Sequence, residues 1–282
     1  SIEFTNKVNV ILDGLAGNDT IDTTPGPQQN LIDGPGQTWS GSPVPDASPF
    51  ALSTDFTGIQ FTGRHALYTY SDTWYPSWAS DGNMYSTYQD GRLDPTSVLI
   101  WGDDDHGNPP GIATTGAAKI VGDDPMNLDV SYVNTIATEY TSSSGEYSGR
   151  YPSGNLVCDG VWYVGSYGAI WQQEPFRNGP FAGFSYSTDY GQTWTLSPFS
   201  LDLDDVLFPQ DQTTFAGPLK SSGPAFVDFG QNMEYAPRNG DGLKMAYLIS
   251  SGFTEAVPTD YGTNDHFYMS RVPLDPEHPE LI

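Results

Sequence analysis

The sequence predicts an all-β protein, and three observations support this prediction. The 282 residues include 31 Gly, 23 Pro, 17 Tyr and 7 Trp, a composition typical of short strands joined by tight turns. From residue 51 onward, short runs of β-forming residues alternate with turn dipeptides, and few windows have helical periodicity. A hairpin pattern also recurs along the chain, which favours a β-propeller over a sandwich or a barrel.

Composition and charge exclude several classes of partner. The chain has 10 Lys+Arg against 35 Asp+Glu, a formal net charge of −25, so we expect no nucleic-acid partner. No run of about 18 apolar residues is present, so we expect no membrane partner. The single cysteine, Cys158, excludes an internal disulfide and a Cys-based zinc site.

The amino-terminal part of the chain is patterned differently from the rest. We expect a loop-rich segment or arm over residues 1–50 and the propeller domain over residues 51–282. Residues 14–22 are similar to one calcium-binding nonapeptide of a β-helix, but one copy cannot form that solenoid, so an Asp/Gly turn is favoured. The glycosylation acceptor Asn18-Asp19-Thr20 is compatible with a secreted, extracellular protein whose leader has already been removed.

The expected strands are short and regularly spaced. A single short helical turn is expected over residues 202–208. The strand-forming runs are 56–61, 66–70, 84–88, 97–101, 156–157, 161–167, 183–187, 225–229, 243–249 and 266–272.

The internal repeat consists of a starting segment, a strand, an Asp-Gly turn and a second strand. Its copies begin at residues 74, 150 and 223, the third being weaker, and their turns lie at 81–82, 159–160 and 241–242. Radial repetition of hairpins is how a propeller avoids open sheet edges. We therefore predict four-stranded blades, five to seven in number. Seven blades at about 45 residues each exceed this chain, which leaves open whether it holds the complete ring.

The clearest local motif is the octapeptide Ser187-Thr188-Asp189-Tyr190-Gly191-Gln192-Thr193-Trp194. We expect a hairpin turn in which the Asp189 carboxylate accepts backbone N–H groups, Gly191 takes positive φ and Trp194 packs beneath. The pattern S-x-D-x-G-x-T-W resembles the Asp box of sialidase-like propellers. It indicates a fold and says little about chemistry.

Beyond this motif, roughly residues 55–275 resemble a group of bacterial and fungal sialidase-like propeller proteins, and more specifically the propeller-fold rhamnose–glucuronate lyases that act on plant gums. The resemblance implies a polysaccharide lyase that cleaves by β-elimination at a glucuronate bearing a terminal sugar such as rhamnose. The segments that carry it are 63–66, 72–82, 150–154, 179–184, 232–237 and 265–272.

Residues at the starts of innermost propeller strands converge on one axial funnel, which is suitable geometry for a binding site. A lyase there needs a bidentate arginine to neutralise the uronate carboxylate, a base for the C5 proton and an acid for the leaving oxygen. We assign Arg150 as the clamp, His65 as the base and Tyr151 as the acid, although His65 could equally be a hydrogen-bonded structural residue. The candidate substrate-binding residues are Arg64, Asp72, Trp74, Tyr75, Arg177, Glu234 and Tyr235.

Two other functions remain open. A glycoside hydrolase would use paired carboxylates drawn from Asp72, Asp103, Asp123 and Glu234. A sialidase-type pair of Glu234 and Tyr235 is disfavoured, because neighbours on a strand point to opposite faces. In a non-catalytic carbohydrate-binding propeller, by contrast, Trp74, Tyr75, Trp78 and Tyr151 would stack on sugars.

In each case we expect an oligosaccharide or polysaccharide as the partner, and the oligomeric state stays open. The global negative charge disfavours long polyanions, so a lyase here should act at a chain end. No cofactor motif is present, and Asp103-Asp104-Asp105 fits an exposed turn better than a calcium site.

Overall fold

The computed structural model describes residues 9–10, 39–40, 66–102, 112–139, 149–170, 177–198, 222–252 and 266–282. The chain divides into two compact units, Ser1–Leu67 and Tyr68–Ile282. In the first unit, β1 (Asn9–Val10) pairs antiparallel with β2 (Trp39–Ser40). The strand expected at 56–61 and the helical turn expected at 202–208 lie outside the described residues.

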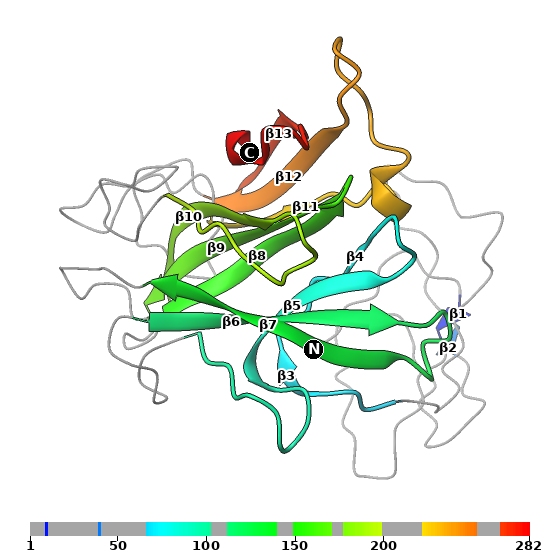
Figure 1. The fold of residues 1–282 in the computed structure, drawn as a ribbon, viewed down its shortest axis with the longest axis vertical. Coiled ribbons are helices and arrows are strands. Elements are labelled where there is room, and N and C mark those ends of the chain that lie inside the picture. The colour runs from blue at the N-terminus through cyan, green and yellow to red at the C-terminus, as the bar shows by residue number, and fades with distance from the viewer. Residues whose placement is uncertain are drawn as a thin grey trace. The chain divides into compact units, whose positions relative to one another are not determined.

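The described part of the second unit contains three antiparallel sheets (Figure 1). Sheet 1 has the order β3-β5-β6-β7, with β4 also paired to β5; sheet 2 has the order β8-β9-β10 and sheet 3 the order β11-β12-β13. The strands are β3 (Tyr70–Asp72), β4 (Ser77–Trp78), β5 (Met84–Arg92), β6 (Ile112–Val121), β7 (Asp129–Glu139), β8 (Gly149–Cys158), β9 (Val161–Ile170), β10 (Arg177–Ser187), β11 (Ser222–Phe226), β12 (Met245–Gly252) and β13 (His266–Pro273).

The all-β prediction is confirmed. The helical segments among the described residues are two 3-10 turns, η1 (Gln231–Met233) and η2 (Pro279–Leu281), and no sheet there closes into a barrel. The described part of the chain also has no helix long and apolar enough to cross a bilayer. Sheets 2 and 3 have three strands each among the described residues, whereas the predicted propeller blades have four.

Most of the expected strands that lie in described segments are present, and two long strands were missed. Residues 97–101 contribute only an isolated bridge, between Ile100 and Gly91, and the run 66–70 reaches a strand only at Tyr70. Strand β6 has a weak sequence signal, because its middle is Gly116-Ala117-Ala118 and Gly and Ala are depleted in strands. Strand β7 contains the β-forming residues Val130, Tyr132, Val133 and Ile136, so its signal was present in the sequence and was overlooked. Packing explains the glycine in β6: a Cβ at Gly116 would collide with the ring of Tyr88 on the paired strand.

The Asp-Gly turns of the repeat are hairpin turns in the structure. Asp159 (φ 49°) and Gly160 (φ 84°) both lie in the left-handed region, the conformation that a two-residue type I′ turn requires, and they join β8 to β9. Gly82 (φ 84°) closes the turn between β4 and β5. In the third copy Gly242 (φ 83°) lies in a short turn that leads into β12.

The contacts expected within the octapeptide 187–194 are also present. Asp189 Oδ1 accepts the backbone N–H of Thr193 at 2.9 Å, and Asp189 Oδ2 accepts its hydroxyl at 2.6 Å. Gly191 has φ 90°, and the Trp194 ring packs edge-on against Trp162, with ring centroids 5.1 Å apart. This turn follows β10 and covers the core between sheets 1 and 2.

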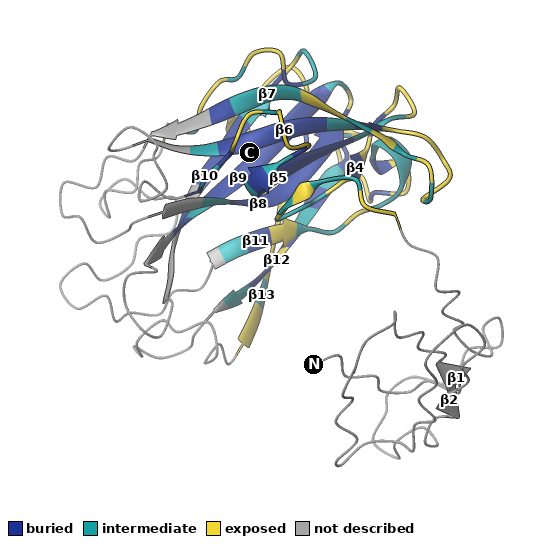
Figure 2. Ribbon diagram, turned by 90° about the horizontal axis from the view of Figure 1, so that it is seen from below, coloured by how far each residue is buried: buried dark blue, intermediate teal, exposed yellow. Residues whose placement is uncertain are grey.

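Sheet 2 is buried on both faces, as Figure 2 shows for β8 and β9. One face packs on sheet 1 through Val157, Trp162 and Val164, which meet Tyr85, Ala117 and Ile136. The other face packs on sheet 3 through Leu156, Cys158, Tyr163 and Phe181, which meet Ala246, Leu248 and Met233. Alternate residues of β8 and β9 therefore serve two separate cores.

One buried amide joins three strands in the first of these cores. The fully buried Trp162 donates its indole N–H to Asn155 Oδ1 at 2.6 Å. Asn155 Nδ2 in turn donates to the backbone oxygen of Tyr85 at 2.9 Å. This residue thus links β8 to β9 and to β5 of the neighbouring sheet.

An ion pair between a buried lysine and a partly exposed aspartate lies at the second core. Lys244, whose side chain is 7% exposed, donates from Nζ to Asp159 Oδ1 at 2.8 Å and to the Asn232 backbone oxygen at 2.7 Å. Cys158 Sγ lies 3.7 Å from the same Nζ. Burial, together with the charge of Asp159, raises the pKa of the Cys158 thiol to about 12, so the thiol stays protonated and is structural.

We predict that Asn155→Leu destabilises the fold by about 1–3 kcal/mol, because the buried Trp162 N–H and the Tyr85 oxygen both lose their partner while the side-chain volume is retained. Urea unfolding would measure this, with the exposed Asn127→Leu as the matched control. A loss equal to that of the control would show that the amide is dispensable.

We also predict a specific acid sensitivity at Asp159. Burial raises the pKa of its carboxyl, but the hydrogen bonds from Lys244 and Asn232 and the Lys244 charge outweigh burial and lower the pKa below its ordinary value. Because the folded pKa is depressed, the stabilisation is full above the unfolded value, about 3.9, and is lost as pH falls through the folded pKa. Between about pH 5 and pH 3, the free energy of unfolding should therefore fall less steeply in Asp159→Asn than in the parent. The exposed Asp241→Asn should retain the parent slope; equal slopes in the two variants would contradict the assignment.

Candidate functional site

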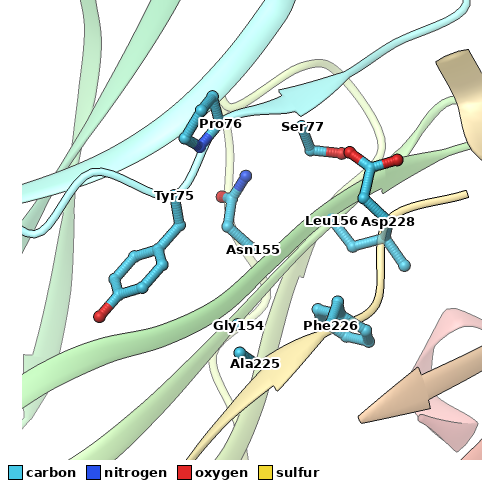
Figure 3. A pocket seen from close by; sticks show the side chains of 9 residues that line it. All are labelled: Tyr75, Pro76, Ser77, Gly154, Asn155, Leu156, Ala225, Phe226 and Asp228. Atoms are coloured by element: carbon cyan, nitrogen blue, oxygen red, sulfur yellow. The ribbon is translucent and has the colours of Figure 1, made fainter. Parts of the chain in front are cut away.

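A pocket of about 120 Å³ lies where β4, β8 and β11 come together (Figure 3). Each of these strands is the first strand of one copy of the hairpin repeat, and β8 contacts β11 on one side and β4 and β5 on the other. Three residues from each copy line the pocket: Tyr75, Pro76 and Ser77; Gly154, Asn155 and Leu156; and Ala225, Phe226 and Asp228. The volume is below the range of about 300–1,000 Å³ typical of drug-sized pockets, so it fits one small ring or a chain end.

Tyr75 forms one end of the pocket in Figure 3. Its backbone N–H donates to Ser86 Oγ at 2.9 Å, which fixes the entry into β4. The side chain is half-buried, and burial, with a smaller contribution from the Asp72 charge, raises the pKa of the phenol. The hydroxyl therefore stays protonated at neutral pH and can donate a hydrogen bond or a proton, but it is not activated as a nucleophile.

The two polar residues in the middle of the pocket are engaged in holding strands together. Ser77 Oγ accepts the backbone N–H of Val157 at 2.9 Å. Both functional groups of the Asn155 amide have partners in the core, as described above. These side chains shape the pocket floor and join β4 to β8, β8 to β9 and β8 to β5.

Asp228 lies just beyond the end of β11, at the other end of the pocket from Tyr75 (Figure 3). Its Oδ1 accepts the backbone N–H of Gly230 at 2.6 Å, which fixes the carboxylate, and the residue is exposed. Among the nine lining residues, this is the one side chain that is charged at neutral pH.

Close approach of β8 and β11 forms the remaining wall. Gly154 has φ 47°, and a Cβ there would lie 2.6 Å from the Pro224 oxygen and 3.2 Å from the Phe226 ring. Phe226 packs in turn on Phe184, with ring centroids 5.2 Å apart. Position 154 therefore admits only glycine without moving one of these strands.

Tyr75 is the one predicted substrate-binding residue that the structure places in this pocket. Asp72 lies exposed on β3 and accepts the Thr73 hydroxyl at 2.8 Å. Trp74 stacks on Tyr88 at 5.1 Å, which is a packing role. Tyr151, the predicted acid, is half-buried on β8 with its ring centroid 6.0 Å from that of Tyr167, outside the pocket lining.

The expectation that Glu234 and Tyr235 start a strand is wrong. Both follow η1 in an irregular loop and are exposed, and neither lines the pocket. The backbone adopts positive φ at Gly230 (83°), Asn232 (53°) and Met233 (54°), so the chain turns sharply here and cannot extend. The argument from opposite strand faces consequently does not apply to this pair.

Other candidates cannot be placed. Arg64, His65 and the Asp103-Asp104-Asp105 cluster lie outside the described residues. Arg150 lies on β8 and Arg177 on β10, but the structure does not describe their side chains.

Trp78 is 46% exposed and donates its indole N–H to the Gly82 oxygen, so it lies over its own hairpin turn. Within the described ranges, no three His, Cys, Asp or Glu side chains are grouped to hold a metal.

Eight of the nine lining residues were missed by the sequence analysis, among them Ser77, Asn155, Phe226 and Asp228. Ser77 lies within the quoted repeat, and Asn155 occupies the corresponding strand when the copies are aligned on their Asp-Gly turns, so the repeat contained a usable signal. Asp228 had no such signal, because the third copy of the repeat is weaker and acidic residues are abundant in the chain, with 35 Asp+Glu.

Comparison with known proteins leaves the family open. No protein-family profile matches the chain, and no curated protein sequence matches it. Among solved structures, the chain is similar to an endo-1,4-beta-xylanase from Bacteroides thetaiotaomicron VPI-5482 at 13% identity, with 73% of each chain covered and a TM-score of 0.29. A TM-score this low does not establish a common fold.

We predict that Gly154→Ala damages the pocket and the fold together. Both Gly154 (φ 47°) and Gly82 (φ 84°) have positive φ, but a Cβ at Gly82 meets nothing within 4 Å. Gly82→Ala should therefore show only the backbone strain of about 1–2 kcal/mol, whereas Gly154→Ala should lose a further ~1–3 kcal/mol from the clash with β11. Thermal and urea unfolding of the two variants would measure the difference, and equal losses would show that β8 and β11 are not in close contact.

Proposed function

We propose that this protein is an extracellular carbohydrate-active enzyme of the sialidase-like, Asp-box propeller type, and that it binds the end of a saccharide chain in the pocket between β4, β8 and β11. As its reaction we propose β-elimination at a glucuronate that bears a terminal sugar such as rhamnose, as the resemblance implies. Fold likeness alone would be weak support for an activity, so the proposal depends on the site.

The observation that carries this proposal is the meeting of equivalent strands. Three successive antiparallel sheets pack face to face, and the first strand of each repeat lies against that of its neighbour. A propeller arranges its innermost strands in this way, and its ligands bind in the hollow that those strands surround. The turn at 187–194 adds support, because its hydrogen bonds are those expected of an Asp box.

The proposed elimination needs three chemical roles. Arg150, on β8 four residues before Gly154, would neutralise the uronate carboxylate and so make the C5 proton acidic. His65 would remove that proton, and the electron pair would form the C4–C5 double bond as the C4–oxygen bond breaks. Tyr151 would donate a proton to the leaving oxygen. Tyr75 is a second candidate, supported by its place in the pocket, and the raised pKa of its phenol keeps it protonated there.

Glycoside hydrolysis is the second candidate, because a carboxylate, Asp228, lies in the pocket. Hydrolysis needs two carboxyl groups about 5–5.5 Å or about 6.5–9.5 Å apart, and the described lining supplies one. A non-catalytic carbohydrate-binding propeller is the remaining alternative.

An oligosaccharide with a glucuronate carrying a terminal neutral sugar separates these possibilities. We predict release of the terminal sugar with new ultraviolet absorbance from an unsaturated uronate, and a loss of turnover of at least about 100-fold in His65→Ala. The exposed His278→Ala is the matched control and should retain full activity.

Other outcomes would redirect the proposal. Reducing sugar without new absorbance would replace elimination by hydrolysis. Binding without turnover would leave a carbohydrate-binding protein. Full turnover in a correctly folded His65→Ala would remove His65 as the base.

A further inference from the structure

The charge of the pocket lining is negative. Of its nine lining residues, Asp228 alone carries a charge at neutral pH, and that charge is negative. The whole chain adds a formal charge of −25. An anionic group entering this pocket would therefore meet an unfavourable local field and an unfavourable overall field.

The polar residues of the pocket differ in how far their hydrogen-bonding atoms are already used. Ser77 Oγ and the Asn155 amide are used between strands. Asp228 uses Oδ1 to accept the Gly230 N–H at 2.6 Å, which orients the carboxylate, while no described residue donates to its Oδ2. A carboxylate presented in this way is an acceptor for hydroxyl groups and is already oriented before the ligand arrives.

The other surfaces of the pocket are apolar. The half-buried rings of Tyr75 and Phe226 and the ring of Pro76 contribute to the lining. Tyr75 and Asp228 lie at opposite ends of it (Figure 3). A ligand that suits this arrangement has C–H groups for the rings and hydroxyl donors for the carboxylate, which describes an uncharged sugar ring.

From these observations we infer that the pocket binds an uncharged sugar ring, that Asp228 recognises its hydroxyl groups, and that Asp228 excludes sugars bearing a carboxylate. The inference rests on the proposed function, carbohydrate binding in this pocket, and it names the chemical class that enters. If the protein is a lyase, the uronate at which it cleaves then lies outside this pocket, and the neutral sugar linked to it lies inside.

Direct binding of three matched sugars tests the inference. The probes are the methyl glycosides of a neutral hexose, of the corresponding hexuronic acid and of the corresponding hexosamine, titrated at neutral pH and followed by calorimetry or by ligand-observed NMR. We expect the neutral glycoside to bind at least about tenfold more tightly than the uronate. In Asp228→Asn this preference should shrink by about tenfold, whereas the exposed Asp241→Asn should keep the parent ratio.

The outcomes are distinguishable. A uronate that binds as tightly as the neutral sugar, or a ratio unchanged in Asp228→Asn, would overturn the inference and leave carbohydrate binding intact. A hexosamine that binds more tightly than the neutral sugar would show simple ion pairing, and would also overturn recognition through hydroxyl groups. If none of the three binds, the proposed function itself fails. Circular dichroism of each variant confirms that the fold is retained.

Discussion

The Asn155 amide is the constraint on which the rest of this structure depends. It lies in the interior, where an unsatisfied polar group costs about 1–3 kcal/mol, and it satisfies the indole N–H of Trp162 and the backbone oxygen of Tyr85 at once. Because Tyr85 belongs to sheet 1 and Trp162 to sheet 2, the same side chain fixes the position of one sheet on the other. It also lines the pocket, so the packing of the core and the position of the site are determined together.

A second set of contacts completes the pocket from the side of sheet 3. Gly154 allows β11 to approach β8 closely, and the Lys244–Asp159 ion pair holds the adjacent hairpin turn to the start of β12. Burying an ammonium group is unfavourable unless its hydrogen bonds are satisfied, and here Asp159 and the Asn232 oxygen provide them. The loop that carries Asn232 begins just after Asp228, so this ion pair also stabilises the segment that presents the pocket carboxylate.

Local signals in the sequence were sufficient to predict turns and hairpins, because Asp159-Gly160 and the 187–194 octapeptide form their structure with near neighbours. Tertiary packing decided what was missed. The Tyr88 ring on the paired strand leaves room only for glycine at position 116 of β6. Asp228 reaches the pocket because β11 packs on β8. Trp74 and Tyr75 are adjacent in sequence, yet one stacks in the core and the other lines the pocket, a distinction that requires the register of β4 and β5.

The most direct measurement is a crystal structure of the full chain soaked with a neutral methyl hexoside. The account predicts that β4, β8 and β11 lie side by side and that the sugar ring sits between Tyr75 and Asp228, with at least one hydroxyl donating to Asp228 Oδ2. A sugar bound elsewhere, or β8 and β11 separated on opposite sides of a two-sheet sandwich, would contradict it.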